Sequence, residues 1–378
     1  MRIAYCIHSI HKTGGKERVL SIKANYLADV LGYEVHIITA ALKGRKPYFP
    51  LSPKVHVHDL NVPDRYVTAH GKYAKALEGL LLEIRPEITI STGCNEIFCL
   101  AALKDGSIKV CEFHFSHDKY IQKYGSSALG RIYAGIRTRK LEKAAAALDC
   151  FVVLTEADRK LWSGTVPDAR QIYNPLTFTS ETQAALDEKR MIAVGRLDPI
   201  KNYPDMVKAW SKVHEKHPDW SLDIFGVGGM RKKISRLIAA NRLEGSVHLC
   251  GRSSDMRSEM LGRSAMVMSS LGEGFPMVML EASVCGLPIV SYDCKCGPSE
   301  IIDNGKSGFV VKEGDVDALA EGICKLIESD ELRKEFGKAA AEKSDEFRIE
   351  RIMQRWDELF QELTFSNLNI ISSSSSGR

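Results

Sequence analysis

The sequence lacks the signals that would place it in a membrane or a secretory pathway. No apolar run reaches the roughly 20 residues that a membrane-spanning helix needs, and no secretory signal is recognised. The ten cysteines stand mostly in apolar runs, so we expect reduced thiols in a cytosol rather than disulfides. These absences favour a cytoplasmic protein, and the length of 378 residues suggests two domains of ordinary size.

Metal-binding and dinucleotide-binding motifs are incomplete. The histidines of His214-Glu-Lys-His217 have the wrong spacing for H-E-x-x-H, and the thiols of Cys294-Lys-Cys296 lack further zinc ligands. Asp315 is better explained as a helix cap than as part of a D-x-D metal motif. The run that starts at Gly226 lacks the third glycine of the dinucleotide fingerprint, because Arg231 stands there. We therefore expect no metal and no cofactor, and an NAD-dependent oxidoreductase is a distant alternative.

Charge is distributed unevenly along the chain. Residues 1–178 contain 25 Lys and Arg against 17 Asp and Glu, a net charge of +8, whereas the remainder contains 27 against 31, a net charge of −4. The basic half is a candidate for binding an anionic partner. No nucleic-acid recognition motif accompanies the charge, so nucleic acid is not expected as the partner.

Buried-strand patterns alternate with helical patterns through both halves of the chain. The first half opens with a strand over 2–7, a glycine-containing loop, an amphipathic helix over 16–31 and a strand over 34–39, which is a βαβ unit. The second half repeats this order from the strand over 191–194. The pattern predicts an α/β protein of two doubly wound, Rossmann-like domains, with a boundary near 176/177 and a terminal segment, 346–378, that combines an amphipathic helix with a disordered tail.

One stretch, Ser269–Pro288, reads as a strand end, a glycine turn and a helix that begins near Met277. The free N–H groups at the start of a helix favour an anion, so a phosphate is expected over this turn. Glu273 lies in the turn and Glu281 within the helix, where it could accept hydrogen bonds from a sugar diol. Acidic residues near a helix start also occur merely as partners of the helix dipole.

Two further groups follow predicted strands. Arg196 and Lys201 lie five residues apart, and such a pair can hold the two phosphates of one diphosphate. His114 ends another strand, with His117 as the runner-up, and ligands of open α/β sheets bind outside the carboxyl ends of strands. The Gly14-Gly15 pair would let the backbone approach a phosphate or sugar. Ordinary surface charges and a structural histidine are the alternatives.

The string E-G-F-P-x-x-x-x-E-A, followed by G-x-P-x-V, resembles the E-x7-E signature of retaining GT-B glycosyltransferases of family 4. The Cys294–Glu300 string also resembles one found in bacterial polysaccharide glycosyltransferases, by which UDP is favoured. The resemblance implies that the two domains face a central cleft. It further implies that Glu281 binds the nucleotide ribose, and that Glu273 and His114 act on the donor sugar.

The resemblance gives a set of expected donor contacts at the cleft. The donor-binding residues are Gly14, Gly15, Arg196, Lys201, Gly226, Gly274, Phe275, Met277, Val278 and Glu281. The first domain would bind the acceptor. The reaction implied is the transfer, with retention, of a hexose or N-acetylhexosamine from a nucleotide diphosphate sugar to a glycan acceptor in surface polysaccharide biosynthesis.

The acceptor is expected to be lipid-linked, as in other members of the family. A basic stretch with interleaved apolar residues, 119–143, is either a solvated helix face or a surface that docks on anionic lipid headgroups, which would make the protein peripheral on the inner face of the membrane. Two other functions stay open. A GT-B nucleotide-sugar epimerase would need no acceptor, and a non-catalytic sugar-nucleotide binding module would have no turnover.

Overall fold

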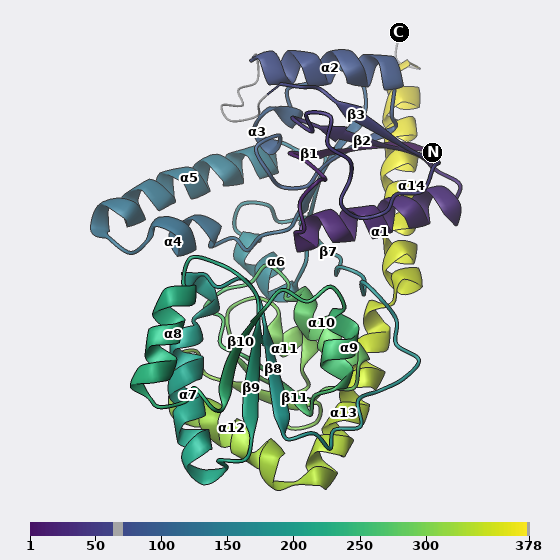
Figure 1. Cartoon of the computed structure of the whole chain (residues 1–378). Helices are drawn as coiled ribbons and strands as arrows, with labels where there is room; N and C mark the ends of the chain where they lie inside the picture. The colour runs from purple at the N-terminus through teal and green to yellow at the C-terminus, as the bar shows by residue number, and fades with distance from the viewer. Residues whose placement is uncertain (63–70, 376–378) are drawn as a thin grey trace. The chain divides into compact units, whose positions relative to one another are not determined.

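The computed structural model describes residues 1–62 and 71–375, with side chains described up to residue 366 (Figure 1). The chain forms two compact units: unit 1 comprises Met1–Thr177 and Ile349–Arg378, and unit 2 comprises Phe178–Arg348. The end of the tail expected to be disordered, 376–378, lies outside the described residues.

Unit 1 is built on a sheet of seven parallel strands in the order β3-β2-β1-β4-β5-β6-β7. The strands at its centre are nearly continuous apolar runs, as expected for a parallel sheet that is covered on both faces. From one edge to the other, the strands are β3 (Val55–Asp59), β2 (Glu34–Thr39), β1 (Arg2–Ile7), β4 (Ile88–Ser91), β5 (Ile108–Phe113), β6 (Cys150–Val153) and β7 (Arg170–Gln171).

The helices of unit 1 cover this sheet, and the last of them comes from the end of the chain. They are α1 (Gly15–Asp29), α2 (Lys72–Ile84), α3 (Ile97–Leu100), α4 (Lys119–Tyr124), α5 (Ala128–Ala146), α6 (Glu156–Trp162) and α14 (Ile349–Ser375). The apolar face of α14 places Met353, Trp356 and Phe360 in the same core as β1 and β2. The C-terminal helix thus packs on the N-terminal domain, beside α1 (Figure 1).

Unit 2 repeats the architecture with six parallel strands in the order β10-β9-β8-β11-β12-β13. The strands are β8 (Arg190–Val194), β9 (Ser221–Phe225), β10 (Val247–Gly251), β11 (Ala265–Met268), β12 (Ile289–Tyr292) and β13 (Gly308–Val311). The helical segments are η1 (Pro199–Lys201), α7 (Tyr203–Lys216), α8 (Arg231–Ala240), α9 (Met256–Leu261), α10 (Met277–Val284), α11 (Pro298–Ile301), α12 (Val316–Glu328), α13 (Asp330–Ser344) and η2 (Asp345–Phe347).

Both sheets are doubly wound, so the predicted fold class is confirmed. In unit 1 the direction of strand addition reverses between β1 and β4, and in unit 2 it reverses between β8 and β11. Ligands of open α/β sheets bind at such reversal points, outside the carboxyl ends of the strands. Throughout the part of the chain that the structure describes, every helix is too short or too polar to span a bilayer.

Candidate functional site

The loops after β8 and β11 are joined directly at the reversal point of unit 2. The backbone N–H of Leu271 donates to the carbonyl oxygen of Ile200 at 2.8 Å. The hydroxyl of Ser269 lies 3.0 Å from the carbonyl oxygens of Lys201 and Asn202. These contacts fix the loop that contains Glu273 against the segment that contains Lys201.

An ion pair between Lys201 and Glu273 is the centre of this site. The Nζ atom of Lys201 lies 2.6 Å from Oε1 of Glu273, and the two side chains are 16% and 12% exposed. The fold thus brings together one of the predicted cations and one of the predicted acids, which stand 72 positions apart in the sequence. A pair that is mostly shielded from water interacts more strongly than a surface pair, which is worth about 0–1 kcal/mol.

Arg196 lies on the same loop, but its guanidinium group has a different partner. It forms an ion pair with Asp198 at 3.0 Å, and its side chain is 81% exposed. Asp198 also accepts a hydrogen bond from the backbone N–H of Lys201, which caps η1. Arg196 is thus free to reorient toward an anion, whereas Lys201 is already fixed.

Helix α10 begins where the sequence predicts, directly after Pro276. Glu281 lies buried within this helix, and Met277 and Val278 are half-buried at its start. The ring of Phe275 is buried and packs on Phe347, with ring centroids 5.8 Å apart. Any contact of Phe275 with a donor would therefore involve its backbone rather than its ring.

Gly226 follows β9 and closes the neighbouring part of the site. Its φ of +150° lies in a region that L side chains rarely adopt, and a Cβ atom there would stand 1.8 Å from the carbonyl oxygen of Gly195. Glycine is required here because the loops after β8 and β9 are in direct contact. Gly274, half-buried, lies in the turn before Pro276.

The remaining predicted residues belong to unit 1. Gly14 and Gly15 form the start of α1. His114 follows β5, its side chain is 5% exposed, and its Nε2 atom lies 3.4 Å from Oε1 of Glu112. Burial lowers the pKa of His114 to about 4, against the opposing effect of Glu112. The other carboxylate oxygen of Glu112 lies 2.6 Å from Nζ of Lys23, in a fully buried ion pair.

His117, the alternative histidine, is held by three acids. Its Nε2 atom lies 2.9 Å from Glu142, its Nδ1 atom 3.5 Å from Asp118, and its backbone N–H donates to Asp158 at 2.8 Å. The hydrogen bond to Asp118 raises the pKa of His117. These contacts give His117 a structural role between α4, α5 and α6, whereas His114 is the more deeply buried of the two histidines, at 5% against 18% side-chain exposure.

Sequence reasoning missed two lysines beside these residues. Lys16 directly follows Gly14-Gly15, and Lys119 stands at the start of the basic stretch, yet both amines reach the loop after β4. The only signal in the sequence is that each follows a strand, because their proximity depends on the order of strands in the sheet.

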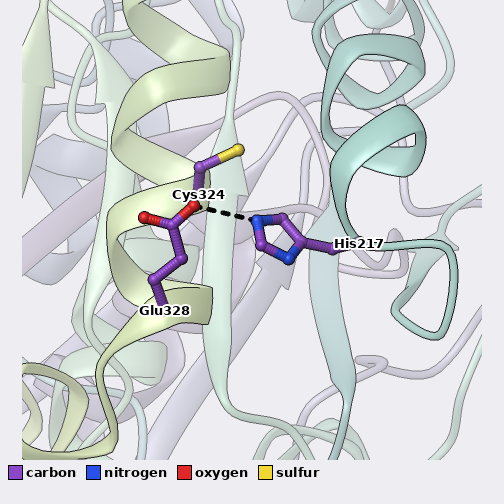
Figure 2. A group of neighbouring side chains, drawn as sticks. All are labelled: His217, Cys324 and Glu328. Carbon is purple, nitrogen blue, oxygen red and sulfur yellow. Dashed lines mark hydrogen bonds and ion pairs between the residues drawn. The ribbon is translucent and has the colours of Figure 1, made fainter.

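A group that could hold a metal ion lies elsewhere in unit 2. The ligand atoms of His217, Cys324 and Glu328 are within 4.8 Å of one another, at the ends of α7 and α12 (Figure 2). His217 precedes β9, so the group belongs to the amino end of the strands, opposite the loops of the candidate site. The contact between Nε2 of His217 and Oε1 of Glu328, at 3.1 Å, accounts for their proximity.

Comparison with known proteins supports an assignment of the second unit. Residues 177–343 match the family described as Glycosyl transferases group 1. An uncharacterized glycosyltransferase from Haemophilus influenzae is 28% identical, with 94% of this chain and 98% of the relative aligned. The amylovoran biosynthesis glycosyltransferase AmsD from Erwinia amylovora is 27% identical, over 95% of this chain and 99% of the relative.

A solved structure shows the same fold along almost the whole chain. A mutant of TarM from S. aureus, in complex with Fondaparinux, alpha-GlcNAc-glycerol and UDP, aligns with a TM-score of 0.77 and 16% identity, covering 95% of this chain and 99% of that one. The architecture is therefore that of GT-B glycosyltransferases. Residues 177–343 are thus similar to a group 1 glycosyl transferase domain, and glycosyltransferases align with this chain over 94–95% of its length.

Proposed function

We propose that this chain is a retaining glycosyltransferase that moves a hexose or N-acetylhexosamine from a nucleotide diphosphate sugar to a glycan acceptor in surface polysaccharide biosynthesis. The observation that carries the proposal is the ion pair of Lys201 and Glu273 at the reversal point of unit 2. It places a cation suited to a phosphate next to an acid suited to a sugar, beside the start of α10.

The donor diphosphate is placed over Arg196, Lys201 and the first turn of α10. The ammonium group of Lys201 has three N–H donors, so it can keep its bond to Glu273 and also donate to a phosphate oxygen. Positive charge at this point stabilises the diphosphate as it leaves the sugar. The two side chains supply this charge, so the transfer needs no metal ion.

The sugar lies next to Glu273, whose negative charge favours the oxocarbenium-like state that forms when the bond to the diphosphate breaks. Glu281 accepts hydrogen bonds from the nucleotide ribose. His114 is neutral at pH 7 because its pKa is about 4, so it contacts the donor sugar as a hydrogen-bonding group rather than as a cation. The leaving diphosphate takes the proton of the acceptor hydroxyl.

UDP is the favoured nucleotide on two grounds. The Cys294–Glu300 string resembles that of bacterial polysaccharide glycosyltransferases, and the TarM structure of the same fold contains UDP. The name of AmsD, which refers to the synthesis of a polysaccharide, supports a glycan acceptor.

A lipid-linked acceptor is supported by helix α5. Leu129, Ile132 and Ile136 are 80%, 63% and 60% exposed, and their spacing puts them on one face. The same face continues with Arg139 and Lys143, both exposed. Apolar side chains that enter the headgroup region, followed by cations, suit an anionic lipid surface. This face, together with α4, which packs beside α5 (Figure 1), docks the protein on the inner face of the membrane.

The test compares nucleotides and variants in one thermal-shift and turnover series. UDP at 100 times its Kd should stabilise the protein by about 2.7 kcal/mol, which raises the Tm by about 5–10 °C, and GDP should do so less. Lys201→Met should weaken UDP binding by about tenfold or more. Lys208→Met is the matched control, because Lys208 pairs with Asp205 on the exposed surface of α7.

Turnover separates the competing activities. Glu273→Gln should keep UDP binding and lower transfer by about 10²–10³-fold, and EDTA should not change the wild-type rate. An isomerised sugar formed without acceptor would indicate an epimerase. Donor binding with no turnover in the wild type would indicate a binding module, and either result would overturn the proposal.

A further inference from the structure

Two lysine amines from different loops of unit 1 converge on the loop after β4. The Nζ atom of Lys16, in the first turn of α1, lies 2.6 Å from Sγ of Cys94 and 3.5 Å from the hydroxyl of Thr92. The Nζ atom of Lys119, at the start of α4, donates to the carbonyl oxygen of Gly93 at 3.3 Å. The two amines thus contact three consecutive residues of one loop, Thr92, Gly93 and Cys94.

The convergence lies at the carboxyl ends of three neighbouring strands. Lys16 follows β1, the receiving loop follows β4, and Lys119 follows β5, and these strands are adjacent in the order β1-β4-β5. The direction of strand addition reverses between β1 and β4. This is the position where an open α/β sheet binds ligands. His114 also follows β5, five residues before Lys119.

The two amines carry positive charge but have no direct ionic partner. Within the described part of unit 1, neither Lys16 nor Lys119 forms an ion pair with a carboxylate. The carboxylates near the amines are Glu96, which is fully buried behind the loop and lies near both, and Glu17, which lies near Lys16. Burial raises the pKa of Cys94, so its thiol stays neutral at pH 7.

Aromatic rings around the amine of Lys119 explain how its positive charge is kept inside the protein. Its amine lies 4.5 to 5.1 Å from the ring centres of Phe113, Phe115 and Tyr120, which attract a cation. Burial lowers the pKa of Lys119 to about 8, so the amine is still mostly protonated at pH 7. Both lysine residues are half-buried rather than fully buried. A buried charge without an ionic partner is costly, and a bound anion would remove that cost.

We propose that Lys16 and Lys119, with the loop at Gly93 and Cys94, form a binding site for a phosphate group of the acceptor. The inference rests on the proposed function, which assigns the donor diphosphate to Arg196 and Lys201 of unit 2. The acceptor class is accordingly one with a phosphodiester or diphosphate near the hydroxyl that receives the sugar. Lysine binds such a group as a point charge, without the planar geometry that arginine imposes.

Inorganic pyrophosphate tests this site by calorimetry on the full chain, with UDP already at saturation. We expect the wild type to bind pyrophosphate under these conditions. Lys16→Met and Lys119→Met should each weaken pyrophosphate binding by about tenfold or more, with UDP binding unchanged. Lys12→Met and Lys123→Met are the matched controls, because each is an exposed lysine four residues away from its counterpart.

The outcomes separate the inference from the function on which it rests. If saturating UDP abolishes pyrophosphate binding, the phosphate site belongs to the donor and the inference is wrong. If the control variants weaken pyrophosphate binding as much as Lys16→Met and Lys119→Met do, the effect is one of general charge and the inference is also wrong. If UDP itself does not bind, the proposed donor site fails, whereas the lysine variants still report on the pyrophosphate site.

A thiol label gives a second measurement that leaves both lysines intact. Cys250 is exposed, Cys94 is half-buried and the other eight cysteines are buried, so in Cys250→Ser the thiol of Cys94 is the most accessible. Pyrophosphate should slow the labelling of Cys94 with the same concentration dependence as its binding. An unchanged labelling rate at saturating pyrophosphate would place the anion elsewhere.

Discussion

The buried histidine of unit 1 should make that unit sensitive to acid. His114 has a folded pKa of about 4, against 6.5 for an exposed histidine, because burial disfavours its charged form. The charged groups that face it are Glu112, which opposes this effect, and Lys23 and Lys16, which add to it. Because the folded pKa is lowered, the unfolded chain takes up the proton first, so stability is lost as the pH falls below 6.5.

The magnitude follows from the two pKa values. At 1.36 kcal/mol per pKa unit, the difference between 6.5 and about 4 corresponds to about 3 kcal/mol, of which about 2 kcal/mol should already be lost between pH 7 and pH 5. His114→Gln keeps a polar side chain but cannot titrate. The variant should therefore lose about 2 kcal/mol less than the wild type over this interval.

The assay is urea unfolding at pH 7 and pH 5, combined with hydrogen exchange resolved by peptide. Protection factors in unit 1, which correct for the slower intrinsic exchange at pH 5, should fall between pH 7 and pH 5 in the wild type and much less in His114→Gln, with peptides of unit 2 as the internal reference. His117→Gln gives the opposite control. The pKa of His117 is raised, so its protonation stabilises the fold in acid, and removing it should increase acid sensitivity. Equal acid losses in the wild type and His114→Gln would refute the reasoning.

Two further predictions concern the lipid surface and the core of unit 2. Ile132→Ser combined with Ile136→Ser should weaken binding to vesicles that contain anionic lipid by about tenfold or more in a sedimentation assay, whereas Leu82→Ser, which changes an exposed leucine on α2, should not; equal losses would contradict docking through α5. Asp223→Asn should lower the free energy of unfolding by about 3 kcal/mol in urea, because the buried carboxylate accepts two hydrogen bonds from Arg263 and contacts Arg190 and His248. A loss below 1 kcal/mol would show that these cations are satisfied elsewhere.

The sequence predicts the architecture well because the strands are buried on both faces. Short runs rich in apolar residues, such as those within Arg2–Ile7 and Cys150–Val153, are typical of buried parallel strands. This argument does not apply to the short strands β7 and β13, since their residues are largely half-buried or exposed. The sequence predicts helix α14 from the helical spacing of its apolar residues, because the apolar face of such a helix must pack on a core.

The candidate site is predictable only as separate parts. A glycine turn, a helix start and a cation after a strand each leave a local pattern, and Glu273 and Lys201 are found in that way. Their ion pair is not local, since it depends on β8 and β11 being neighbours in the sheet. The convergence of Lys16 and Lys119 also cannot be predicted from the sequence, because it depends on the order of strands in the sheet. Their loops follow β1 and β5, which lie on either side of β4.

The two units differ in whether the cations at the carboxyl ends of their strands are paired with acids, and this difference matches the uneven charge of the chain. At the site of unit 2, Arg196 pairs with Asp198 and Lys201 pairs with Glu273, so each cation has an acidic partner. At the corresponding edge of unit 1, Glu96 lies near both amines and Glu17 lies near Lys16, but neither amine forms an ion pair among the described residues. An anion bound in unit 2 competes with existing ion pairs, whereas an anion bound in unit 1 would give the two amines an ionic partner. The net charge of +8 in the first half thus has a local counterpart where a phosphate-bearing acceptor would be held.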